Sequence, residues 1–115
     1  MEAKTKNTIA TVLSAIVALG FIFFGGTKII RHEMIVENFK KWGLSDMFRY
    51  MIGGLEIAGA IGLFIPGLRK WAALGLMGLM MGAIYTHMSN GDGIAGSGMA
   101  LAMFALAGVV YLLRR

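Results

Sequence analysis

Four long apolar runs, separated by short polar segments, dominate the chain. Residues 8–27, 50–65 and 71–87 are almost continuously apolar, and a fourth run follows the turn at 90–93 and reaches Leu113. A helix needs about 20 apolar residues to cross the hydrocarbon core of a bilayer. No small-residue cleavage pattern follows the first run, so we expect a retained span rather than a signal peptide. The pattern predicts four transmembrane helices in one domain covering residues 1–115.

The segment between the first two runs, residues 31–48, is polar but patterned. Ile35, Phe39 and Trp42 recur at positions i, i+4 and i+7, and charged residues occupy other positions around the helix. This spacing predicts an amphipathic helix that lies at the membrane interface or covers the bundle, with Trp42 at headgroup depth. A solvated connecting helix is the alternative. The predicted fold class is all-α: a transmembrane four-helix bundle with a short amphipathic interfacial helix between spans one and two.

Composition supports the membrane interpretation. The chain is 57% hydrophobic and only 15% charged, and its mean hydropathy is +0.73. A net charge of +5 would favour nucleic acid in a soluble protein, but the basic residues here lie at the edges of the apolar runs. We therefore expect the lipid bilayer as partner and no nucleic acid. With no cysteine, the chain itself cannot perform disulfide exchange, thiolate attack, thioether haem attachment or iron–sulfur ligation.

The distribution of lysine and arginine predicts the orientation. An even number of spans places both termini on one side, with six basic residues, Lys4, Lys6, Arg69, Lys70, Arg114 and Arg115, against five in the opposing loops, Lys28, Arg31, Lys40, Lys41 and Arg49. Short cytoplasmic loops carry the excess of positive charge. We expect an integral, multi-pass protein of a bacterial-type cytoplasmic (inner) membrane with both termini inside.

Glu56 is a carboxylate within the apolar run 51–65. An acid at this depth usually faces a protein interior or a wet cavity, because exposing it to lipid costs a few kcal/mol at least. On a helix its neighbours are Gly53, Gly59 and Ala60, a stripe of small residues that faces other helices. Glu56 is thus predicted to lie in a protein-lined recess.

Lys28 and His87 are the other two candidate site residues. With four spans, Lys28, Glu56 and His87 fall in the same half of the membrane, where they could converge as a site for proton handling or for a polar headgroup. Purely structural roles are the alternatives: Lys28 could extend its stem to the interface, His87 could cap its helix, and Glu56 could serve as a hydrogen-bonded link between helices.

Two further patterns have structural interpretations. Gly75, Gly78 and Gly82 form one stripe, which predicts close packing against a neighbouring helix, within the bundle or in a homo-oligomer. The ten methionines are compatible with Cu(I), but methionine also fills apolar interiors, and no His-x-x-x-His pair or second intramembrane carboxylate occurs. No metal site is expected.

Several short motifs occur in an order that resembles the DoxX-like family of small membrane proteins: Gly25-Gly26-x-Lys28, Gly53-x-x-Glu56, Gly62-Leu63-x-x-Pro66, and His87 late in the third run. The resemblance covers nearly the whole chain. It implies a compact four-helix transmembrane bundle and points to Lys28, Glu56 and His87 as functional positions. Members are linked to thiosulfate:quinone oxidoreduction and to oxidative-stress complexes, but the lack of cysteine here departs from any thiol-based role.

The favoured function is an accessory or binding subunit. Its Glu56, Lys28 and His87 site would accept a quinone-like or lipid-like ligand or dock a membrane redox partner. No intrinsic cofactor is expected, and a quinone is the candidate ligand. One alternative is a membrane enzyme, a quinone-coupled oxidoreductase or isomerase, that uses Glu56 and His87 for proton transfer. The other is a purely structural membrane subunit.

Overall fold

The computed structural model describes residues 2–30, 33–91 and 93–115, together with their side chains except at positions 34 and 93–96. Within these ranges the chain forms five α-helices and no strand, which confirms the all-α fold class: α1 (Ala3–Ile29), α2 (Glu33–Lys41), α3 (Asp46–Gly62), α4 (Arg69–Ser89) and α5 (Gly93–Arg114). Residues 31–32, where the predicted amphipathic segment starts, lie outside the described residues.

Three helices in the described ranges are long and apolar enough to cross a membrane: α1, α4 and the Ser97–Arg114 part of α5. Helix α3 has 17 residues, at the lower end of the range of about 17–25 that spans a bilayer. It stops before the predicted limit of the second span because Pro66 and Gly67 follow closely. The role of α3 as a fourth span therefore stays a prediction.

The helix ends follow from local chemistry. Ser45 precedes α3, and its hydroxyl accepts a hydrogen bond from the backbone N–H of Phe48 at 3.1 Å, which satisfies one of the free donors of the first turn. The turns after α3 and α4 contain Gly67 and Gly91 with φ of 89° and 78°. A side chain would be strained in this left-handed conformation, so glycine allows the chain to reverse direction.

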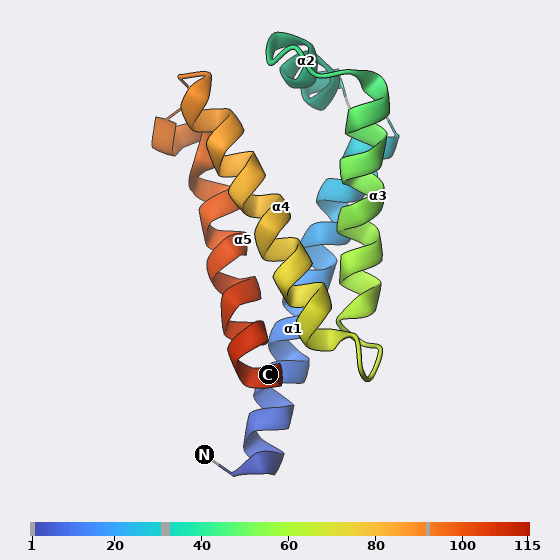
Figure 1. The fold of residues 1–115 in the computed structure, drawn as a ribbon, viewed down its shortest axis with the longest axis vertical. Coiled ribbons are helices and arrows are strands. Elements are labelled where there is room, and N and C mark those ends of the chain that lie inside the picture. The colour runs from blue at the N-terminus through green and yellow to red at the C-terminus, as the bar shows by residue number, and fades with distance from the viewer. Residues whose placement is uncertain (1, 31–32, 92) are drawn as a thin grey trace.

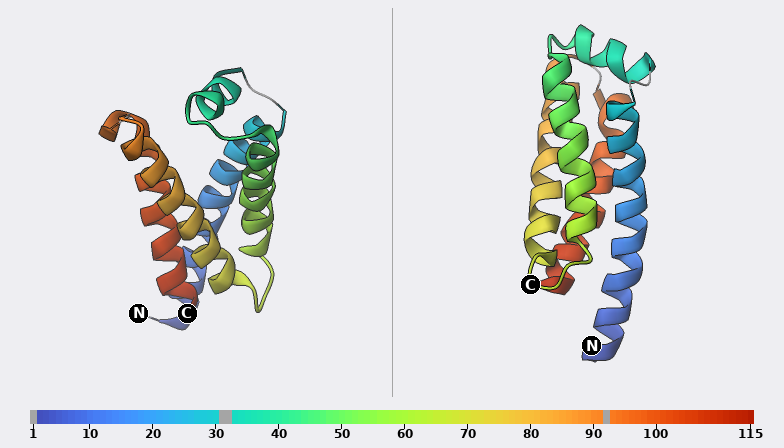
Figure 2. Two further views of the ribbon diagram at one scale, coloured as in Figure 1. Left: turned by 45° about the horizontal axis from the view of Figure 1, so that its top comes forward. Right: turned by 90° about the vertical axis from the view of Figure 1, so that its right-hand side faces the viewer.

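The helices pack as two pairs, α1 with α3 and α4 with α5. The pairs meet closely near the α3–α4 turn and spread apart towards α2, which lies across the wide end (Figures 1 and 2). The buried apolar core belongs mainly to the narrow end, with Phe21 of α1, Leu63 just after α3, Leu76 of α4 and Val110 of α5. The buried core is thus smaller at the α2 end.

Large apolar side chains cover the outside of the bundle. Leu19 and Phe23 of α1 are 69% and 64% exposed, and Met81 of α4 is 60% exposed. Soluble proteins rarely expose apolar surface on this scale, whereas lipid chains solvate it. At the two ends of α4, Trp71 and Tyr85 are also exposed, as expected for aromatic side chains at the membrane boundaries. The surface is that of a membrane protein.

The two glycine stripes differ in how they pack. On α3, a side-chain carbon at Gly59 would come within 2.6 Å of Leu76, so this stripe does receive another helix, as predicted. On α4, by contrast, positions 75, 78 and 82 are exposed, and a side-chain carbon added there would have no neighbouring atom of the described residues within 4 Å. The prediction of close packing within the bundle is therefore wrong for this stripe. Helix α4 instead buries the face that carries Leu76, because that leucine fits over the α3 glycine. Contact of the α4 stripe with a second copy stays a prediction.

Candidate functional site

Two glycines bring α1 and α3 together. A side-chain carbon at Gly25 would lie 2.6 Å from the carbonyl oxygen of Gly53, and one at Gly53 would lie 2.8 Å from the carbonyl oxygen of Gly25. Only glycine permits backbones to approach this closely. Lys28 and Glu56 each follow one of these glycines by three residues, about one helical turn. The crossing therefore places a lysine on α1 beside a carboxylate on α3.

Lys28 and Glu56 form an ion pair. The Lys28 Nζ atom lies 2.7 Å from Glu56 Oε1, and the two side chains are 16% and 1% exposed, respectively. The second carboxylate oxygen, Oε2, is buried and has no hydrogen-bond partner among the described residues. The predicted protein-lined recess is thus confirmed in geometry. The burial of two charges is costly unless they are paired, and here one oxygen of the acid still has capacity to accept a hydrogen bond.

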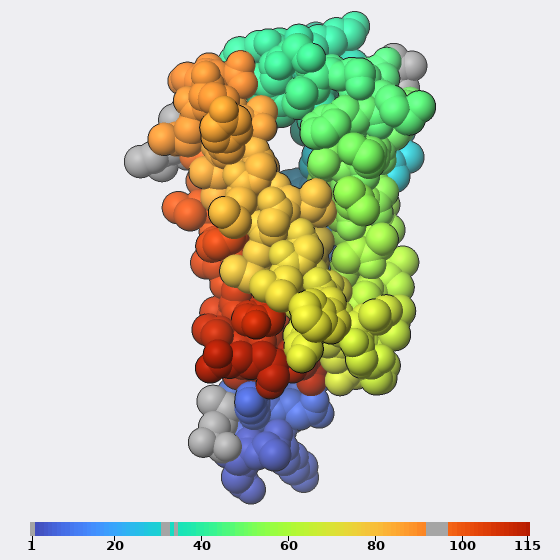
Figure 3. All heavy atoms as spheres, viewed as in Figure 1, coloured from blue at the N-terminus to red at the C-terminus, as the bar shows by residue number. Residues whose placement is uncertain are grey.

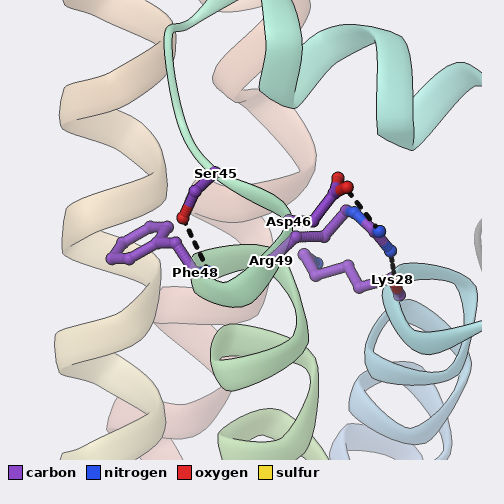
Figure 4. A network of polar contacts seen from close by, with 5 residues as sticks. All are labelled: Lys28, Ser45, Asp46, Phe48 and Arg49. Atoms are coloured by element: carbon purple, nitrogen blue, oxygen red, sulfur yellow. Dashed lines mark hydrogen bonds and ion pairs between the residues drawn. The ribbon is translucent and has the colours of Figure 1, made fainter.

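Arg49 contacts the backbone of Lys28, a role that sequence reasoning missed (Figure 4). Its guanidinium, buried in the structure, donates hydrogen bonds to the backbone carbonyl of Lys28 and to Asp46 Oδ1, the latter at 3.3 Å. It also lies 4.4 Å from the centre of the Tyr50 ring, a cation–π distance. Arg49 therefore joins the end of α1 to the start of α3 and fixes the position from which Lys28 extends.

A cavity of about 280 Å³ adjoins the ion pair. Lys28, Glu56 and His87 all line it, so the structure brings the three predicted residues to one space. The rest of its wall is mainly apolar and aromatic, with the described side chains Phe24, Ile35, Phe39, Trp42, Leu44, Phe48, Ile52, Leu79, Met80, Ala83, Met99, Ala100 and Met103, together with the polar Asn38 and Thr86. In Figure 3 a gap is visible between α3 and α4 beneath α2, where the cavity reaches the surface.

Helix α2 and the following residue, Trp42, form the roof of this cavity. The rings of Phe39 and Trp42 lie 5.3 Å apart, and Trp42 meets the His87 imidazole edge-to-face at 4.9 Å. The periodic apolar face predicted for this segment thus covers the bundle, one of the two arrangements expected from the sequence. Because Trp42, the residue that follows α2, reaches His87 on α4, this segment bridges the opening between the two helix pairs.

The chemistry available here is binding through hydrogen bonds, charge and aromatic faces. Within the described ranges no three His, Cys, Asp or Glu side chains gather closely enough to hold a metal ion. Lys28 and Asn38 offer donors and Glu56 offers an acceptor, whereas the Thr86 hydroxyl already donates to the backbone carbonyl of Gly82 at 2.8 Å. One sequence signal could have identified Arg49 as part of the site: it precedes Glu56 by seven residues, which is about two helical turns and hence the same face.

Comparison with known proteins is consistent with these features. No curated protein and no solved structure matches the chain. A family model does match, over residues 12–112, which include α3, α4 and the Lys28, Glu56 and His87 positions. With a helical bundle, an apolar exterior and this match over nearly its full length, the protein belongs to the DoxX-like family.

Proposed function

We propose that this protein is an accessory membrane subunit that binds a quinone-like molecule in the cavity beside the Lys28–Glu56 pair. One observation carries the proposal: a cavity with aromatic walls ends on a buried carboxylate whose Oε2 atom has no hydrogen-bond partner among the described residues. Ligand sites typically combine apolar walls with a few polar groups that orient the ligand. A purely apolar ligand would leave this carboxylate oxygen without a hydrogen-bond donor.

The wall chemistry suits a quinone ring. A quinone has flat apolar faces and two carbonyl oxygens, which accept hydrogen bonds. Phe39, Trp42 and Phe48 supply aromatic surface for the faces, and the Lys28 ammonium is a donor for one carbonyl. On reduction the oxygens become hydroxyl groups, which can donate to Glu56. The same site can therefore hold both the oxidised and the reduced form.

The cavity volume limits how much of the molecule can enter. At about 280 Å³ it lies just below the usual range of about 300–1,000 Å³ for ligand pockets. A single substituted ring fits this volume, whereas an isoprenoid tail of several units does not. The tail would leave through the gap between α3 and α4 (Figure 3) and continue among lipid chains.

An accessory role is favoured over independent redox catalysis. The chain has no cysteine and therefore no thiol to exchange electrons with a quinone. Electrons for quinone reduction would come from a membrane redox partner, to which this subunit would present or supply the quinone. Proton exchange with Glu56 belongs to the same scheme and does not require this chain to be an enzyme.

Equilibrium binding of a short-chain ubiquinone to the purified full-length protein in detergent tests the proposal. We expect saturable binding of the quinone and of its reduced form, the quinol. The quinol should bind about 10- to 100-fold more weakly to Glu56→Gln, because the hydrogen bond from its hydroxyl to the charged Glu56 carboxylate is lost. Glu37→Gln is the matched control, because it makes the same chemical change at a position that is exposed on α2. Circular dichroism and size exclusion would show that both variants are folded.

Three outcomes would contradict the proposal. Quinone binding could be absent in the parent protein, or the quinol could bind Glu56→Gln as strongly as the parent. Phosphatidylcholine could also displace the quinone at comparable concentration, which would identify the cavity as a general lipid site rather than a quinone site.

A further inference from the structure

A second pocket lies at the opposite end of the bundle from α2. It has a volume of about 420 Å³ and is bounded by the start of α1, the α3–α4 turn, the start of α4 and the end of α5. Its described lining residues are Ala3, Lys6, Asn7, Pro66, Gly67, Arg69, Lys70, Leu113 and Arg114. Figure 1 shows these segments together near the two chain termini. We call it the basic pocket.

Four cationic side chains from three helices share this space: Lys6, Arg69, Lys70 and Arg114. No carboxylate occurs among the described lining residues, and the ion pairs between described residues, Lys28–Glu56 and Asp46–Arg49, lie near the other end. Like charges in proximity repel one another. The cluster is therefore electrostatically unfavourable unless an anion joins it.

The arginines are partly withdrawn from solvent. The Nε atoms of Arg69 and Arg114 are buried and have no hydrogen-bond partner among the described residues. Basic side chains that only flank a membrane span extend freely towards water. Arg114 instead donates from Nη1 to Asn7 Oδ1 at 2.6 Å and from Nη2 to Thr11 Oγ1 at 3.1 Å. Its guanidinium is thus held in a fixed orientation at the pocket.

The start of α4 adds to the positive potential. Arg69 is the first residue of this helix, and the preceding residue, Leu68, provides no side-chain cap. The free backbone N–H groups of a first turn and the helix dipole both favour an anion. The positive side chains and the start of α4 therefore both favour the binding of an anion in the basic pocket.

We propose that the basic pocket binds the phosphate group of an anionic phospholipid. Phosphate accepts several hydrogen bonds and pairs well with arginine. Free phosphate shares this chemistry, but the surroundings favour a lipid, because Leu68, Trp71 and Leu112 near the pocket are 49%, 60% and 53% exposed and offer apolar surface to acyl chains. Basic pockets between membrane helices recognise lipid headgroups in this way. The site is independent of the cavity at the α2 end.

Native mass spectrometry of the full-length protein, titrated with phosphatidylglycerol in detergent, tests this assignment. The test variant is Lys6→Gln with Arg69→Gln, because both side chains line the pocket, and the hydrogen bonds between described residues that join helices here come from Arg114 instead. The matched control is Lys4→Gln with Arg115→Gln. It removes the same residue types from the same end, at exposed positions outside the pocket.

We expect the parent to retain one phosphatidylglycerol and the test variant to bind it about 30-fold more weakly. The control should stay close to the parent at about 0.15 M salt, because screening weakens charges outside the pocket. Equal losses in both variants would show general surface attraction and overturn the proposal, as would no retained lipid or equal retention of phosphatidylcholine. Full displacement by millimolar inorganic phosphate would assign the pocket to free phosphate and overturn the lipid assignment. Thermal unfolding of each variant confirms that binding is compared between folded proteins.

Discussion

Replacing Lys28 with methionine would leave the Glu56 carboxylate buried without its partner. The Glu56 side chain is 1% exposed and its Oε1 atom lies 2.7 Å from Lys28 Nζ, so the variant removes the compensating charge and keeps most of the side-chain volume. If the pair holds α1 against α3 as the structure indicates, this single change destabilises the bundle although it removes no apolar contact from the core.

The size of the effect follows from the burial of each partner. Breaking a buried ion pair by removing one member costs about 3–5 kcal/mol. Because Lys28 is 16% exposed, water reaches the site and we expect about 3 kcal/mol. Glu56→Gln should cost only about 1 kcal/mol, since the lysine stem can extend to the interface. The double variant should lose about 2 kcal/mol rather than the sum of about 4, a coupling of about 2 kcal/mol.

Free energies of unfolding for the parent, both single variants and the double variant would be measured in mixed micelles, with the loss of helical circular dichroism as the signal. Lys40→Met is the control, because Lys40 is an exposed lysine at the same end of the bundle. It should change stability by less than about 0.5 kcal/mol. The reasoning is refuted if Lys28→Met behaves like Lys40→Met, or if the two single effects add in the double variant.

Two further predictions concern packing and topology. Gly25→Ala should lower the free energy of unfolding by about 1–3 kcal/mol through overpacking, because the added carbon would meet the α3 backbone at 2.6 Å. Gly26→Ala is the control and should not lower it, because the added carbon would have no described neighbour within 4 Å. Equal effects of the two variants in the same micelle assay would contradict the α1–α3 crossing. The chain has no cysteine, so single cysteines report sidedness with a membrane-impermeant thiol reagent. Lys4→Cys and Arg115→Cys should be labelled from the cytoplasm and Lys40→Cys from the outside. Labelling of positions 4 and 115 from opposite sides would exclude an even number of spans, and labelling of all three from one side would show that α1 does not cross the membrane.

Sequence reasoning succeeds where the chain gives a local signal. Pro66, Gly67 and Gly91 mark the turns that bound the helices, and the apolar runs predict where the long helices lie, although α1 (Ala3–Ile29) extends beyond the predicted 8–27 at both ends. A single carboxylate in an apolar run has few stable environments, so the sequence alone places Glu56 in a protein-lined recess. The spacing of Ile35, Phe39 and Trp42 likewise predicts the apolar face of the segment that covers the bundle.

The failures have physical causes. Helix α4 is apolar on all sides, and such a helix does not reveal which face packs, so its glycines suggest an interface although Leu76 and Met80 are the buried side chains. Arg49 resembles a flanking charge in the sequence because it stands at a polar boundary. Its spacing from Glu56 places it on the same face of α3, but its burial depends on a tertiary contact, the approach of the end of α1 to the start of α3.

The central claim, that the cavity at the α2 end binds a quinone, can be tested with the two tryptophans of the chain. Trp42 lines the cavity, and Trp71 is exposed at the far end of α4. A short-chain ubiquinone would be titrated into the Trp71→Phe and Trp42→Phe variants, and the quenching of tryptophan fluorescence recorded for each. The account predicts saturable quenching of Trp42 at one quinone per chain and only weak, non-saturating quenching of Trp71. Equal, linear quenching of both tryptophans would contradict it.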